Sequence, residues 1–88
     1  MNQENDFKAS LSTLILSIGS AAMMALGEAP HPDTGKIEQD LKMAKFNIEL
    51  LDLLKEKTVN NLTKEEDQLI AQILNDLKLK FVKLNKST

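Results

Sequence analysis

The chain has 88 residues, of which 42% are hydrophobic and 27% charged, with no Cys, Trp or Tyr and a net charge of −2. A chain of this length forms one domain with a small core, and its apolar content is too high for a charge-swollen disordered protein. The absence of Cys excludes disulfides and thiolate zinc sites, and the use of Lys for all eleven basic residues removes the two-point guanine contacts that Arg makes. We therefore expect a single domain over residues 1–88 that binds no specific nucleic acid.

Helical spacing of apolar residues predicts a first helix over residues 7–26, capped by Asp6 and ended by Gly27. The predicted core face of this helix consists of Phe7, Leu11, Leu14, Ile15, Ile18, Ala22, Ala25 and Leu26. Its reverse face carries no charge and includes Leu16, Gly19 and Met23 among small side chains. A helix without a charged face is usually buried on both sides, and small residues allow a neighbour to approach closely.

The run from Ala9 to Gly27 contains 19 residues without a charge, close to the minimum length of a membrane span. Ser and Thr side chains dilute this run, and Glu4 and Asp6 make the preceding segment acidic. No small-residue cleavage site for a signal peptidase follows. We expect neither membrane insertion nor secretion, and a cytoplasmic location.

A connector is predicted over residues 27–36, because Pro30 and Pro32 interrupt a helix and the segment from Pro32 to Gly35 suits a type I turn. A second helix is predicted over residues 37–58. Its seam consists of Ile37, Leu41, Ala44, Ile48 and Leu51, and further apolar residues are Met43, Phe46, Leu50, Leu53 and Leu54. This apolar arc is wider than one neighbouring helix can cover, so the second helix needs at least two partners.

Residues 59–63 form the second predicted connector, in which Asn60 suits a left-handed helix end. Thr63 and Glu66 match a capping box, so a third helix is predicted over residues 64–84. Its apolar face consists of Leu69, Ile70, Ile73, Leu74, Leu77, Phe81 and Leu84. Residues 77–81 also alternate like a strand, but no other segment could pair with them. The predicted fold is all-α: a three-helix bundle, or a helical hairpin plus a third helix, completed by dimerisation.

Two features resemble catalytic or metal chemistry. Asp33, Thr34 and Gly35 spell the aspartic-protease triplet, but that site needs a second Asp on a paired β-rich lobe. His31 is the single histidine and has no coligands at metal-binding spacing. We expect a turn and an exposed loop residue, with no catalytic residue, metal or cofactor, and hence no enzyme.

Two surfaces are candidates for binding. The predicted self-association surface consists of Leu16, Gly19, Met23, Met43, Phe46, Leu50 and Leu53. The predicted anion or membrane contact consists of Lys78, Lys80, Lys83 and Lys86, which could equally complement the carbonyl end of the last helix. The sequence favours a non-catalytic module that forms a homodimer and contacts other proteins. The alternative is an adaptor that binds a membrane surface or a partner through the first helix and the Lys-rich end.

The order of these segments also resembles a small bacterial family catalogued as domain of unknown function 1844. The resemblance covers residues 7–83 and is most specific at Leu26–Gly27, Pro30–Gly35, Asp40–Leu41, Lys57–Thr58, Asn61–Leu62 and Glu65–Glu66. It implies a short, soluble, helical protein and supplies no activity. The chain departs from the family pattern at Asn60, where Gly is usual, and at Lys78 and Phe81, where Arg and Tyr are frequent.

Overall fold

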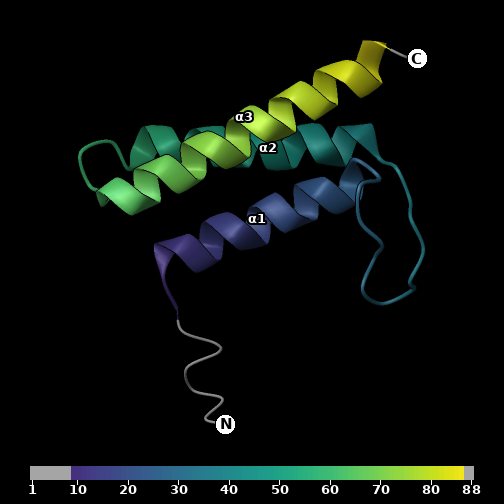
Figure 1. Cartoon of the computed structure of the whole chain (residues 1–88), viewed down its shortest axis with the longest axis horizontal. Coiled ribbons are helices and arrows are strands. Elements are labelled where there is room, and N and C mark those ends of the chain that lie inside the picture. The colour runs from purple at the N-terminus through teal and green to yellow at the C-terminus, as the bar shows by residue number, and fades with distance from the viewer. Residues whose placement is uncertain (1–8, 87–88) are drawn as a thin grey trace, which may run out of the picture.

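The computed structural model describes residues 9–86, which form three α-helices: α1 (Leu11–Ala25), α2 (Leu41–Lys57) and α3 (Lys64–Lys86). The chain runs along α1, reverses into α2 and reverses again into α3, so α1 and α3 point the same way (Figure 1). Each helix packs against the other two. The all-α prediction is confirmed for the described residues.

The first helix begins four residues later than predicted. Ser10 has extended backbone, and its hydroxyl accepts a hydrogen bond of 3.1 Å from the Thr13 N–H. A serine in this position satisfies one of the free N–H groups of the first turn. The prediction of a helix from residue 7 is therefore wrong, while the proposed Asp6 cap and the place of Phe7 lie outside the described residues.

The second helix also begins later, at Leu41 rather than at residue 37. Asp40 caps it by accepting a 3.1 Å hydrogen bond from the Met43 N–H. The backbone N–H of Asp40 donates to the Ala25 carbonyl at 2.8 Å. This bond joins the end of α1 to the start of α2, so the connector extends over residues 26–40 and Ile37 lies in it, 65% exposed. The prediction that Ile37 belongs to the core seam is wrong.

Gly27 ends α1 as predicted, with φ of 82°. The N–H of Gly27 donates to the Met24 carbonyl and that of Glu28 to the Met23 carbonyl, both at 3.0 Å. This pair of bonds is a Schellman motif, which requires the left-handed residue that glycine supplies. The chain then leaves the helix axis and enters the connector.

The reversal between α2 and α3 follows the sequence prediction. Asn60 adopts the left-handed conformation with φ of 70°. Thr63 and Glu66 form the reciprocal capping box: the Thr63 N–H donates to Glu66 Oε1 at 2.8 Å, and the Glu66 N–H donates to Thr63 Oγ1 at 3.1 Å. The third helix continues through residues 77–81 to Lys86, so their strand-like alternation has no structural counterpart.

Apolar residues from all three helices form one core. The buried set is Ile15, Ala22, Ala25, Leu26, Ala44, Ile48, Leu51, Ile70, Leu74 and Leu77. The predicted apolar face of α3 is confirmed, because its remaining members pack against this set. Leu14 is 46% exposed, so its assignment to the core is wrong. Within residues 9–86, no helix combines the length and hydropathy required to cross a membrane.

Replacing Leu51 with Ala tests the core assignment. Leu51 has no exposed surface, and its truncation leaves a cavity that lowers the free energy of unfolding by about 2–5 kcal/mol. Leu79, 61% exposed on α3, provides the matched control, for which we expect a change below about 1 kcal/mol. Urea denaturation at one fixed protein concentration measures both values, and equal losses would contradict the assignment.

Asn60 allows a second test, of the backbone in the α2–α3 reversal. Asn60→Ala places a residue of poor left-handed propensity at φ of 70°, so we expect a loss of about 1 kcal/mol in unfolding free energy. Asn60→Gly retains the conformation and should match or exceed the stability of the unmodified chain. The midpoints of urea denaturation of the two variants measure this difference. A loss of the same size in both would show that the Asn60 side chain, and not its backbone conformation, stabilises the reversal.

Candidate functional site

An exposed apolar stripe on α2 is the most prominent candidate surface. We define the outer face of α2 as Met43, Phe46, Leu50 and Leu53, which are spaced three, four and three residues apart and so share one side of the helix. Met43 is 50%, Phe46 52% and Leu53 49% exposed, and Leu50 is half-buried. The core residues of α2, Ala44, Ile48 and Leu51, lie on the opposite side. All four residues of this face belong to the predicted self-association surface.

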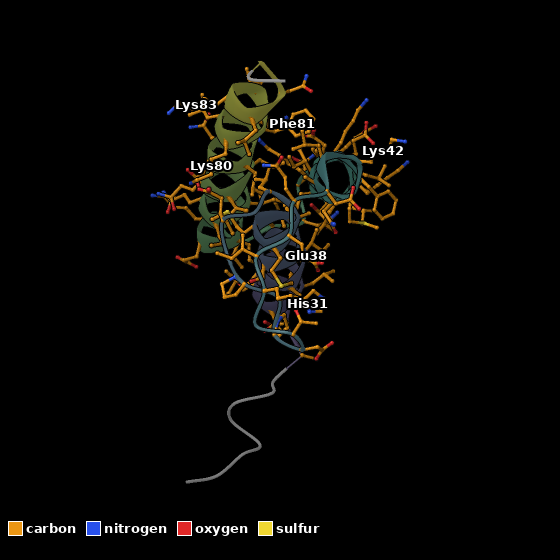
Figure 2. The ribbon with its side chains drawn as sticks, turned by 90° about the vertical axis from the view of Figure 1, so that its right-hand side faces the viewer. His31, Glu38, Lys42, Lys80, Phe81 and Lys83 are labelled. Atoms are coloured by element: carbon orange, nitrogen blue, oxygen red, sulfur yellow. The ribbon has the colours of Figure 1, made fainter. Side chains whose placement is uncertain are left out.

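Charged residues follow one edge of this face at intervals of seven. They are Lys42, Glu49 and Glu56, and all three are exposed. Figure 2 shows Lys42 pointing outward from α2, on the side of the molecule opposite Lys80 and Lys83. Among residues 9–86, none of the three lies within ion-pair distance of an opposite charge.

The other edge of the outer face adjoins the protein's own core. Asn47 is 8% exposed, and its side-chain amide donates to the Met43 carbonyl at 2.9 Å. Leu54 packs against the core cluster. The outer face therefore has one charged edge and one edge without charges.

The α1 members of the predicted self-association surface lie elsewhere. Leu16, Gly19 and Met23 line a groove of about 570 Å³, whose other walls are α3 and the connector. None of the four outer-face residues of α2 lines this groove. Ala29, Pro30 and Pro32 contribute to it. Sequence spacing cannot predict this contribution, because it depends on how the connector folds back.

Gly19 is buried by α3 rather than by a second chain. A Cβ atom on Gly19 would lie 3.1 Å from Cγ2 of Ile73, tighter than an ordinary van der Waals contact, so Ile73 would have to shift slightly. The small-residue face of α1 thus admits a close neighbour, as its composition predicts, but this neighbour is α3 of the same chain. Gly19 is consequently removed from the candidate association surface.

The lysines near the C-terminus are largely engaged within the molecule. Lys78 donates to Asp52 of α2 at 2.9 Å, and Lys80 donates to both carboxylate oxygens of Asp76, at 2.9 and 2.7 Å. Lys83 also has an interaction partner, and the side chain of Lys86 lies outside the described part. The cationic charge available to an external anion is therefore smaller than the sequence suggests.

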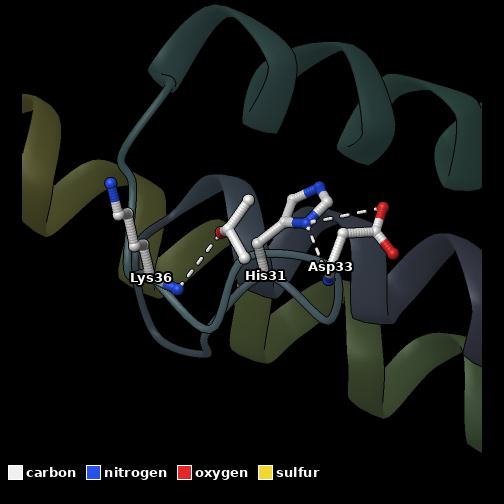
Figure 3. A network of polar contacts seen from close by, with 4 residues as sticks. His31, Asp33 and Lys36 are labelled. Carbon is white, nitrogen blue, oxygen red and sulfur yellow. Dashed lines mark hydrogen bonds and ion pairs between the residues drawn. The ribbon is translucent and has the colours of Figure 1, made fainter.

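The connector contains a closed loop around His31 (Figure 3). The His31 carbonyl accepts from the Gly35 N–H, and the His31 N–H donates to the Lys36 carbonyl, both at 2.8 Å. The Asp33 N–H donates to His31 Nδ1 at 3.2 Å, and the Lys36 N–H donates to Thr34 Oγ1 at 3.2 Å. The predicted turn is thus a five-residue α-turn, closed by the hydrogen bond between the Gly35 N–H and the His31 carbonyl, and not a four-residue type I turn.

The protease-like triplet forms part of this loop. Its Asp33 side chain is 87% exposed and lies 4.0 Å from His31 Nδ1. A nearby hollow of about 430 Å³ is lined by His31, Glu38 and Asp40, but the Asp40 carboxylate is already the cap of α2. No group of three potential metal ligands converges among residues 9–86.

Comparison with known proteins places the chain in a family. The family model described as "Domain of unknown function (DUF1844)" matches residues 8–83, nearly the whole chain and almost the range of the sequence resemblance. The search among curated proteins and the search among solved structures gave no match.

Proposed function

The chain is a member of the DUF1844 family, and we propose that it is a non-catalytic helical module that self-associates through the outer face of α2. The observation that supports this proposal is the exposure of three large apolar side chains, Met43, Phe46 and Leu53, along one straight stripe. Large apolar side chains gathered in one stripe, rather than scattered singly over a surface, favour contact with a partner. We further propose that the assembly is a homodimer that contacts other proteins in the cytoplasm.

The stripe supplies sufficient area for a small interface. Half of the Phe46 side chain corresponds to roughly 100 Å², and half of Met43 or Leu53 to roughly 50 Å² each, so the three contribute about 200 Å² per copy. Covering this area on two copies contributes about 10 kcal/mol before the costs of association. Those costs are about 4–15 kcal/mol, similar in size to the gain, so we expect a weak, reversible dimer.

Other exposed apolar residues form a shorter patch. Leu79 and Val82 of α3 are 61% and 48% exposed, but Lys78, Lys80 and Lys83 surround them in the sequence. Ile37 and Val59 are isolated residues in the two connectors. Among the described residues, α1 exposes two large apolar side chains, Leu14 and Leu16, and α3 also exposes two, whereas α2 exposes three along one side. This is why we place the interface on the outer face of α2.

The oligomeric mass of charged variants tests this placement. Phe46→Glu introduces a charge into the outer face. At a concentration at which light scattering gives twice 9.8 kDa for the unmodified chain, we expect 9.8 kDa for this variant. Leu79→Glu, at a similarly exposed position on α3, should leave the dimer unchanged. Unaltered helical circular dichroism in both variants shows that the fold is intact.

The Leu16→Glu variant distinguishes the two candidate surfaces. Leu16 is 51% exposed and lines the groove between α1 and α3. We expect this variant to remain dimeric. Dissociation by Leu16→Glu together with persistence of the dimer in Phe46→Glu would move the interface to the groove and contradict the proposal.

The membrane-adaptor alternative leads to a separate experiment. Because Lys78 and Lys80 already pair with Asp52 and Asp76, we expect no flotation of the protein with anionic phosphatidylserine vesicles at low ionic strength. Flotation that disappears at high salt would instead support an electrostatic membrane contact, since exposed charges are screened under those conditions.

A further inference from the structure

The self-association proposed above has a preferred orientation, which follows from the symmetry of the outer face of α2. Its four residues are arranged symmetrically about position 48, with Met43 and Leu53 at the ends and Phe46 and Leu50 at the centre. If two such stripes meet in antiparallel fashion, Met43 of one copy lies against Leu53 of the other, and Phe46 lies against Leu50. The spacing is that of alternate a and d positions in a two-helix seam.

The two edges of the stripe distinguish the antiparallel from the parallel arrangement. In an antiparallel pair, like edges meet, so the charged edges of the two copies face each other and the core-side edges face each other. In a parallel pair, the charged edge of each copy would face Asn47 and Leu54 of the other, which are buried and half-buried next to the core. Charged groups placed there would lose water without gaining an opposite charge.

The charges on the facing edges are complementary in the antiparallel register. Lys42 of each copy lies against Glu56 of the other, so the twofold symmetry produces two such pairs. Glu49, one residue from the centre of the stripe at position 48, lies close to the symmetry axis and next to Glu49 of the second copy, a like-charged pair flanked by the two Lys42–Glu56 pairs. Lys42, Glu49 and Glu56 have no ion pair within the described part of the chain, and all three are exposed.

A further carboxylate on this side of α2, that of Asp52, already forms an ion pair within the chain. Asp52 is bound by Lys78 of α3 at 2.9 Å, so it does not compete for Lys42 of the second copy. The charged edge that remains has one Lys and two Glu at intervals of seven. It meets the same edge of a second copy only in the antiparallel pair, where the reversal places Lys42 against Glu56.

We propose that two copies of this chain pair through antiparallel α2 helices, with Met43 against Leu53, Lys42 against Glu56, and the two Glu49 residues adjacent at the twofold axis. The partner is thus a second copy in a defined register. This inference rests on the proposed self-association and adds its geometry.

Thiol cross-linking tests the register directly, because the chain contains no cysteine of its own. Glu49→Cys places two thiols beside each other at the axis, and we expect a short bis-maleimide to convert the dimer into a covalent species. In Met43→Cys the two thiols are separated by about 15 Å along the helix axes, since positions 43 and 53 are ten residues apart. We therefore expect no cross-link from Met43→Cys alone, but a cross-link when it is mixed with Leu53→Cys.

A charge exchange provides the second measurement. Lys42→Glu and Glu56→Lys should each weaken the dimer by about tenfold, because each replaces two attractive contacts with repulsive ones. The double variant should regain the affinity of the unmodified chain. Lys45→Glu changes the same charge away from the edge, and combining it with Glu56→Lys should produce no recovery.

The outcomes separate this inference from the proposal on which it rests. A dimer in which Met43→Cys cross-links with itself and Glu49→Cys does not is parallel, which overturns the register but leaves self-association intact. A dimer in which neither single variant cross-links also overturns it. A monomeric mass for the unmodified chain at every concentration up to millimolar overturns both.

Discussion

The structure depends on one constraint: the three helices of one chain cannot bury all of the apolar surface that they carry. Helix α2 contacts α1 and α3 through Ala44, Ile48 and Leu51, and these neighbours occupy only part of its circumference. The apolar residues of α2 extend further round, so Met43, Phe46 and Leu53 stay half exposed. Apolar surface exposed in this way is costly in water, and a second α2 helix can cover it without any change of fold.

The same constraint explains the close packing of α1. Gly19 allows Ile73 of α3 to approach to within van der Waals distance, so the uncharged side of α1 is used inside the chain. The bond from the Asp40 N–H to the Ala25 carbonyl then holds the start of α2 beside the end of α1. Together these contacts leave the outer face of α2 as the long uncovered stripe.

Much of this fold could be predicted from the sequence, because local chemistry determines it. Gly27 and Asn60 adopt left-handed backbone, and Thr63 and Glu66 form their capping box, as their residue types predict. The predicted starts of α1 and α2 lie too early in the chain, because the apolar spacing continues before Ser10 and Asp40. The structure shows that these two residues cap the helices. The width of the apolar arc on α2 was predictable. That α3 covers Gly19, and that Lys78 and Lys80 are paired, depends on tertiary contacts that spacing does not specify.

Sedimentation equilibrium of the unmodified chain over micromolar to millimolar concentrations tests the central claim most directly. Self-association through α2 predicts a reversible transition from 9.8 kDa to twice that mass as concentration rises. A single species of 9.8 kDa throughout this range would contradict it, and would show that the outer face of α2 stays in contact with water.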